Sequence, residues 1–136
     1  MRLIVEADGG SRGNPGLAAG GAVVVDEETG ELLAEIGVFV GIATNNVAEY
    51  SGMIAGIKRA LEIDEEASLR VLMDSKLVVE QMSGRWKIKH PDMQTLAKQA
   101  RELIAGRDVV FEWVPRNLNS RADAAANEAM DRRASF

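Results

Sequence analysis

The chain has 136 residues, 46% of them hydrophobic, which is enough for one domain with a buried core. It contains no cysteine, so disulfide bonds and cysteine-ligated zinc are excluded, and this composition fits a reducing compartment. No apolar run reaches membrane-spanning length, so we expect a cytoplasmic protein without a membrane partner. The net charge of -5 argues against a partner held by general electrostatics, unless metal ions neutralise clustered acids.

The first part of the chain predicts an antiparallel meander. An apolar strand that starts at Leu3 leads into Asp8, and the glycines directly after it predict a tight turn or the close approach of another segment. Two β-branched runs, residues 20–26 and 31–40, follow after short links typical of turns. Three strands joined in this way form one half of a sheet.

A long amphipathic helix is predicted next. It opens near Thr44, and its apolar side chains recur every three or four residues as far as Leu61. Such a helix forms a crossover connection, so the strand predicted at residues 67–74 should run parallel to the first strand.

Three further helices and one strand complete the predicted fold. A short helix is predicted at residues 75–83, an amphipathic helix at 93–104 and a strand at 107–114, and the last helix begins near Ser120. The pattern predicts an α/β fold in which a five-stranded mixed sheet, an antiparallel meander plus parallel strands, is flanked by helices. We expect residues 1–136 to form a single domain.

Four carboxylates stand where predicted strands end or predicted helices begin: Asp8, Glu49, Asp74 and Asp123. Each has an ordinary alternative role, because Asp8 can bond its own turn and the other three can cap a helix. In a sheet of this kind, ligands gather beyond the carboxyl ends of the parallel strands, where Asp8 and Asp74 are expected as neighbours. The acids at the two helix starts can point into the same region.

The chemistry of these acids favours hard cations. Four neighbouring carboxylates repel one another unless cations lie between them. Oxygen ligands without cysteine or nearby histidine select Mg²⁺ or Mn²⁺ over zinc. Two such ions about 4 Å apart are a known device for in-line attack on a phosphodiester. The residues therefore favour a metal-dependent phosphodiesterase, with helix capping as the alternative for each acid.

Four segments, in this order and spacing, resemble type 1 ribonuclease H: DGGSRGNPG, TNNVAEY, VLMDSKLVVEQ and WVPRNLNSRADAAANEA. The resemblance covers essentially the whole chain and implies a ribonuclease H-like fold. It also implies that Asp8, Glu49, Asp74 and Asp123 bind two metal ions together with substrate. The implied reaction is cleavage of the RNA strand of RNA/DNA hybrids, which leaves 3′-hydroxyl and 5′-phosphate ends.

Polar groups around the acids are candidates for substrate binding. RNA can be recognised through its 2′-hydroxyl in the shallow minor groove, for which the backbone of residues 9–11 and the side chains of Asn14, Asn46 and Glu49 are suitable. The resemblance implies that Asn14 and Thr44 hold a DNA phosphate and that Asn45 and Asn46 reach the minor groove. A turn at Asn14 and helix caps at Asn45 and Asn46 are the ordinary alternatives. The full candidate set for the hybrid is Gly9, Gly10, Ser11, Asn14, Thr44, Asn45, Asn46, Trp86, Lys87 and Arg116.

Two segments depart from the family pattern. Many bacterial members have a histidine before the last helix, whereas residues 114–119 offer Arg116, and His90 lies elsewhere in the chain. Several members carry a long basic protrusion, for which residues 84–91 are too few. Trp86 in this segment can stack on a deoxyribose or be a half-buried structural residue. We expect weak affinity for the hybrid and a strong dependence on salt.

Residues 71–91, with VPR before the last acid, resemble the ribonuclease H domain that precedes a phosphatase-type domain in some actinobacterial proteins. The chain is therefore either a stand-alone enzyme or a domain of a longer parent protein with a C-terminal phosphatase-type domain. Three alternatives stay open: another nuclease of the same fold, such as an exonuclease or junction resolvase, a hybrid-binding module without turnover, and a structural domain stabilised by a metal.

Overall fold

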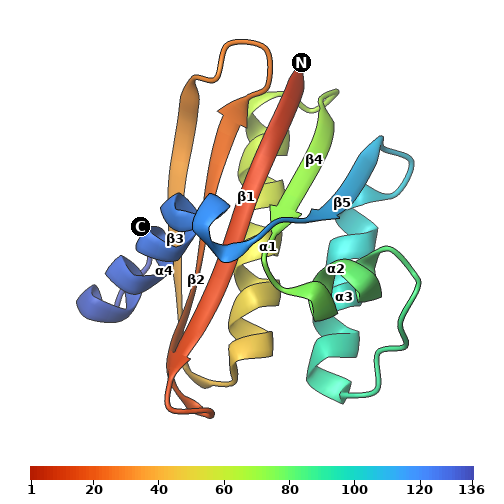
Figure 1. The fold of residues 1–136 in the computed structure, drawn as a ribbon. Helices are drawn as coiled ribbons and strands as arrows, with labels where there is room; N and C mark the ends of the chain where they lie inside the picture. The colour runs from red at the N-terminus through yellow and green to blue at the C-terminus, as the bar shows by residue number, and fades with distance from the viewer.

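A five-stranded mixed sheet forms the centre of the computed structural model, which describes residues 1–136. The strand order is β3-β2-β1-β4-β5, and helices lie on both faces of the sheet (Figure 1). The strands are β1 (Arg2–Arg12), β2 (Gly16–Asp26), β3 (Leu32–Ala43), β4 (Ser68–Met73) and β5 (Val109–Trp113). The helices are α1 (Asn45–Ile63), α2 (Lys76–Met82), α3 (Pro91–Ile104), the 3-10 turn η1 (Arg116–Leu118) and α4 (Ser120–Arg132). The predicted fold class is confirmed.

The register of the sheet brings two of the predicted acids to the same level. β1 is antiparallel to β2 and β2 to β3, whereas β1 is parallel to β4 and β4 to β5. Ala7 on β1 lies opposite Met73, the last residue of β4. Asp8 and Asp74 directly follow these two residues, so they lie next to each other where β4 ends.

The turn predicted directly after Asp8 is wrong. β1 continues through both glycines as far as Arg12. The other expectation, a close approach of a second segment, is confirmed, because a methyl group on Gly9 would collide with the α1 backbone at Ala48 and Glu49. The glycine therefore serves helix packing, and the chain reverses only later.

Several elements begin or end a few residues from their predicted bounds. β2 begins at Gly16 instead of residue 20, and β3 continues to Ala43 instead of residue 40. The small residues at these ends pair with the neighbouring strand although they lack the β-branched side chains that mark a strand in the sequence. β4 and β5 are shorter than predicted, and the predicted loop before α4 contains η1.

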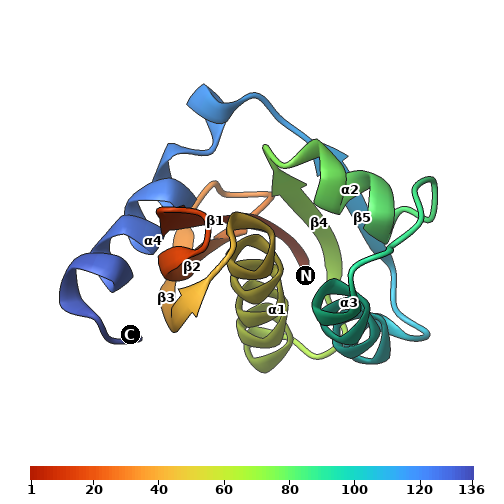
Figure 2. The ribbon, with the colours of Figure 1, turned by 90° about the horizontal axis from the view of Figure 1, so that it is seen from below.

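Glycines let α1 and α4 approach the sheet closely from opposite faces. α1 and α3 lie together on one face, and α4 crosses β1, β2 and β3 on the other (Figure 2). A methyl group on Gly20 would collide with the α1 backbone at Gly52, and one on Gly21 with the α4 backbone at Ala122 and Ala126. Two helices that carry predicted acids are thus held against the central strands.

The main hydrophobic core fills the space between the sheet, α1 and α3. Its largest fully buried side chains include Tyr50, Met53 and Ile57 from α1 and Leu3 and Leu69 from the strands. Burial of such apolar surface is the main favourable contribution to folding. No helix of the structure combines the length and the apolar composition that crossing a membrane requires.

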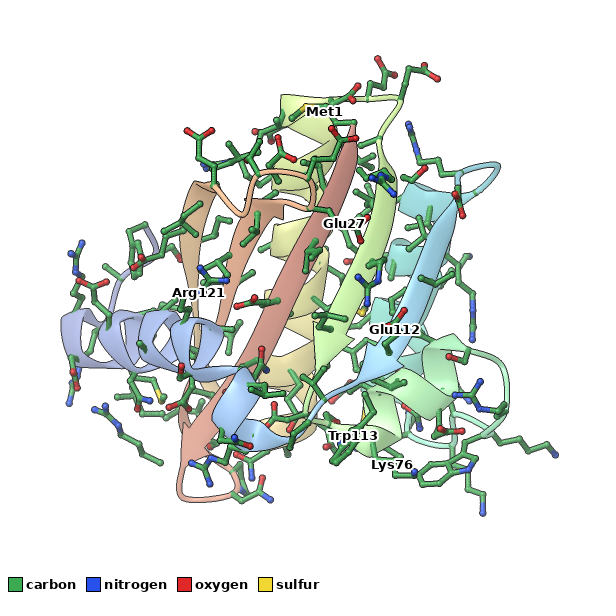
Figure 3. The ribbon with its side chains drawn as sticks, turned by 45° about the horizontal axis from the view of Figure 1, so that its top comes forward. Met1, Glu27, Lys76, Glu112, Trp113 and Arg121 are labelled. Carbon is green, nitrogen blue, oxygen red and sulfur yellow. The ribbon has the colours of Figure 1, made fainter.

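Ion pairs occupy the part of the sheet that α4 leaves uncovered (Figure 3). Arg70 on β4 contacts Glu27 at 2.9 Å and Glu112 at 2.8 Å, and Arg121 at the start of α4 contacts Glu6 at 2.8 Å. The arginine side chains of these pairs are partly exposed to solvent, which screens each interaction. The glutamates neutralise the charges of Arg70 and Arg121, and this face of the sheet stays polar.

The C-terminal residues fasten α4 to the edge strand β3. The backbone N–H of Phe136 donates to the carbonyl of Gly37 at 2.9 Å, and the N–H of Gly37 donates back at 3.1 Å. The guanidinium of Arg132 lies 4.7 Å from the centroid of the Phe136 ring. Part of the exposed edge is covered in this way, and the end of α4 is fixed relative to the sheet.

Gly9→Ala should destabilise the fold, because its methyl group would push the start of α1 away from β1. Overpacking of this kind costs about 1–3 kcal/mol of unfolding free energy. Gly10→Ala on the same strand is the matched control, since its methyl group would meet only the side chain of Met130 at 3.6 Å. Thermal and urea unfolding measure both, and equal stability of the two variants would contradict the close packing at Gly9.

Candidate active site

An open polar cavity of about 400 Å³ lies where β4 ends. All four predicted acids line this cavity, although they come from four different elements. Asp8 lies within β1, Glu49 in the second turn of α1, Asp74 directly after β4 and Asp123 in the first turn of α4. Of the candidate substrate-binding residues, the cavity also contains Gly9, Gly10, Ser11, Asn45 and Arg116.

None of the acids forms the helix cap that was their ordinary alternative, and at α1 and α2 a hydroxyl group forms it instead. The hydroxyl of Thr44 caps α1 by accepting from a backbone N–H at 3.3 Å, and that of Ser75 caps α2 at 3.3 Å. Asn119 precedes α4 but makes no capping bond with its side chain. The capping interpretation is therefore wrong for the three acids predicted at helix starts.

Asp8 is the most buried of the four acids, with 8% of its surface exposed. Burial, together with the negative charge of Asp74, raises the pKa of Asp8 to about 8, although the backbone N–H of Gly9 opposes the shift. The carboxyl group of Asp123 adds both charge and a hydrogen bond with Asp8. At neutral pH, without cations, this group therefore holds a proton that an isolated aspartate would have lost.

Glu49 is destabilised as an anion in the same way. Burial raises its pKa to about 7, with a smaller contribution from the charge of Asp74, while the hydroxyl of Ser75 opposes the shift through a hydrogen bond. Its Oε2 is buried and has no hydrogen-bond partner in the protein. A buried carboxylate oxygen without a donor lacks the partner that such atoms normally have.

The donor set fits a hard divalent cation whose coordination is completed by other ligands. The free Oε2 of Glu49 and the mutual repulsion around Asp8 are both relieved by a positive charge in the cavity. No three acidic or histidine side chains converge on one point as a complete ligand sphere would. Mg²⁺ commonly uses one or two carboxylates and takes its remaining ligands from water and substrate phosphates.

Two residues that the sequence did not single out contact Asp74. The side-chain amide of Asn119 donates to Oδ1 of Asp74 at 3.0 Å and to the carbonyl of Ala7 at 2.8 Å. The indole N–H of Trp113, which Figure 3 shows at this edge of the sheet, donates to the carbonyl of Asp74 at 3.1 Å. In the sequence, Asn119 is indistinguishable from an ordinary helix cap, and Trp113 from a strand residue.

Residues 6–129 match a family model described as reverse transcriptase-like. The chain is 55% identical over 132 residues to the bifunctional protein Rv2228c of Mycobacterium tuberculosis, covering 96% of this chain and 36% of that protein. The solved N-terminal RNase H domain of Rv2228c superposes with a TM-score of 0.91 and 54% identity, over 96% of this chain and all of that domain. The chain belongs to the ribonuclease H family. Divalent metal dependence is general in this family.

Two further relatives support this assignment of the ribonuclease H domain. Ribonuclease HI of Halobacterium salinarum is 44% identical over 128 residues, which are 91% of this chain and 62% of that protein. LC11-RNase H1, solved in complex with an RNA/DNA hybrid, has a TM-score of 0.91 and 36% identity over 97% of this chain and 99% of that chain. The chain thus spans about a third of the length of the mycobacterial protein and about three fifths of that of the Halobacterium enzyme.

Asn45 connects the start of α1 to β1 in this ribonuclease H domain. Its Oδ1 accepts the backbone N–H of Ser11 at 2.8 Å, and its own backbone N–H donates to Oδ1 of Asn14 at 3.2 Å. The hydroxyl of Ser11 donates to the carbonyl of Ala43 at 2.8 Å. A capping role for the Asn45 side chain is therefore wrong, because Thr44 caps α1.

The remaining candidate residues lie outside the lining of the acidic cavity. Thr44 lines a second cavity of about 540 Å³ together with Pro15 and His90. Trp86 is 45% exposed and lies in the link between α2 and α3. The complete set outside the acidic cavity is Asn14, Thr44, Asn46, Trp86 and Lys87. The structure thus divides the predicted binding residues between the acidic cavity and the surface around it.

Asp8→Asn should stabilise the cation-free protein more at pH 8 than at pH 5. The pKa of Asp8 is about 8 in the folded protein, above its ordinary value of 3.8. The free energy of unfolding therefore falls as the pH rises from about 4 to about 8, because the unfolded chain ionises this group more readily. Asparagine removes this ionisation. Thermal unfolding in EDTA at both pH values measures the difference from the parent protein, and added Mg²⁺ should narrow the gap at pH 8.

Asp108→Asn is the control for this measurement, because Asp108 is exposed just before β5. Its effect on stability should be small at both pH values. A stabilisation by Asp8→Asn that does not change between pH 5 and pH 8 would contradict the assigned cause.

Proposed function

We propose that this chain is a metal-dependent endonuclease that hydrolyses the RNA strand of RNA/DNA hybrids and leaves 3′-hydroxyl and 5′-phosphate ends. The observation that carries the proposal is the meeting of four carboxylates, from β1, α1, α4 and the end of β4, in one open cavity. Membership of the ribonuclease H family supports the same reaction, as does the hybrid complex of LC11-RNase H1.

Mg²⁺ or Mn²⁺ is the proposed cofactor, held by Asp8, Glu49, Asp74 and Asp123. When bound, two such ions supply an activated water and stabilise the leaving oxygen of the phosphodiester. The four acids come from separate, well-packed elements, so their positions are fixed before substrate arrives. The cavity is open, which leaves room for the backbone of a duplex at the acids.

Asn45 and Arg116 are the proposed contacts to substrate inside the cavity. The Oδ1 of Asn45 already accepts from Ser11, so its amide nitrogen remains as a donor for a 2′-hydroxyl or a base edge. Arg116 forms no ion pair with the protein and lines the acidic cavity, where its charge can offset that of a phosphate. Asn14 and Thr44 are proposed to hold a DNA phosphate outside this cavity.

We also propose that residues 1–136 act as one domain and that a longer parent protein carries a second, phosphatase-type domain. The match to only 36% of the bifunctional mycobacterial relative supports this arrangement. All four proposed metal-binding acids lie within this chain.

Asp74→Asn should reduce hydrolysis by several orders of magnitude while the fold survives, because it removes a charge that the cations need. An end-labelled RNA/DNA hybrid, with RNA duplex, DNA duplex and single-stranded RNA as comparisons, measures cleavage in Mg²⁺, Mn²⁺ and EDTA. Internal cuts in the RNA of the hybrid, dependent on metal, are the expected result for the parent protein and for Asp108→Asn.

Intact hybrid in every metal condition, with folded parent protein, would overturn the proposed function. Binding without cleavage would then favour a hybrid-binding module. Cuts that begin at strand ends or at branched DNA would favour another nuclease of the same fold, and tight Ca²⁺ binding without nucleic-acid affinity a structural domain.

Arg116→Ala should lower turnover or slow product release, because the cavity loses its unpaired cation. We expect a loss of about 100-fold, the lower end of what removing one group that stabilises developing charge costs. Lys98→Ala, an exposed change on α3, is the control. Steady-state and single-turnover kinetics on the hybrid separate the two steps, and unchanged rate and affinity would show that Arg116 does not act on substrate.

A further inference from the structure

Asn119 connects the two acid-bearing strands from a third element. It is 1% exposed and stands at the junction of η1 and α4. Its Nδ2 donates to the carbonyl of Ala7, the residue before Asp8, and to Oδ1 of Asp74. One amide group therefore uses both of its protons at the place where β1 and β4 present their acids.

The chemistry of the contacts allows only one orientation of this amide. If Oδ1 took the place of Nδ2, it would face a carbonyl oxygen and a carboxylate oxygen, both of which are acceptors. The observed orientation leaves Oδ1 of Asn119 buried and without a donor. A buried acceptor without a donor lowers the stability of the fold. The stability of the fold therefore does not explain why an asparagine stands at this position.

Asp74 is held at its backbone as well as at its carboxylate. The indole N–H of Trp113 donates to the carbonyl of Asp74, and the backbone N–H of Val114 donates to the carbonyl of Met73 at 2.9 Å. The only hydrogen bond to the side chain of Asp74 comes from Asn119. With the backbone fixed, Asn119 decides how the carboxylate is rotated, and Oδ2 stays free of hydrogen bonds.

We propose that Asn119 is a positioning residue, which turns the carboxylate of Asp74 so that one oxygen stays available for a divalent cation. This inference rests on the proposed function for its effect on catalysis, whereas its effect on cation binding stands independently. Groups that orient a metal ligand typically change metal affinity or activity by about 10- to 100-fold when they are removed. Asn119 touches no substrate in this assignment, so its loss should act through the cation.

Asn119→Ala tests the proposal with two separate readouts. Mn²⁺ binding to the free protein, followed by calorimetry and by electron paramagnetic resonance, should weaken about 10- to 100-fold. In hybrid cleavage, kcat should fall, the Mg²⁺ concentration for half-maximal rate should rise, and KM for the hybrid should stay the same. Asn119→Asp should have a larger effect, because it places a carboxylate against two acceptors.

Gln81→Ala is the matched control. Gln81 is also a buried amide, 2% exposed, and it accepts from the hydroxyl of Tyr50 at 2.7 Å and donates to the carbonyl of Lys87 at 3.3 Å, but it contacts no acid. It should lower the melting temperature and leave Mn²⁺ affinity unchanged. If Asn119→Ala behaves like Gln81→Ala, with a lower melting temperature and unchanged Mn²⁺ affinity and Mg²⁺ dependence, the positioning role is overturned.

The two readouts distinguish failure of this inference from failure of the proposed function. A parent protein that cleaves hybrid while Asn119→Ala keeps its kcat and Mn²⁺ affinity overturns the inference alone. A parent protein that binds Mn²⁺ but leaves the hybrid intact overturns the proposed function, and weaker Mn²⁺ binding by Asn119→Ala then still supports the positioning role.

Discussion

The burial of Asp8 is the constraint on which the rest of the site depends. A carboxylate in the middle of a strand, 8% exposed and surrounded by other acids, is unfavourable as an anion, and the raised pKa of Asp8 expresses this cost. The hydrophobic core on the other side of the sheet keeps β1 in place despite it. A site of this kind gains stability when a cation enters, because the same charges that repel one another then become ligands.

Close packing at glycines explains how four distant segments meet at this strand. Gly9 and Gly20 admit α1 on one face, and Gly21 admits α4 on the other, so Glu49 and Asp123 reach the same strand end as Asp74. Each of these glycines has backbone of another element where a side chain would be. The acids can therefore be placed accurately without any direct bond between α1 and α4, since both helices are positioned by the same two strands.

The sequence predicted the sheet and its parallel pairing, and the four acids that it singled out lie in one cavity, because these features follow from apolar patterning and from the places where strands and helices end. The prediction was wrong where small residues determine the packing. Gly9 predicts a turn in the sequence, yet it lies within β1 and packs against the backbone of α1. The contact of Asn119 could not be predicted for a different reason. A polar residue before a helix predicts a cap, and only the folded chain shows that its amide bonds Asp74 instead.

The same distinction separates the acids from the residues around them. Thr44 and Ser75 cap α1 and α2, so neither Glu49 nor Asp74 serves as a helix cap. Asn119 occupies the N-cap position of α4, but its side chain forms no cap: its amide donates to Asp74 and its Oδ1 stays unpaired. Neutral hydroxyl groups thus cap the starts of α1 and α2, whereas the four acids line the cavity. This division lets the acids repel one another in the absence of a cation without unfolding the elements that carry them.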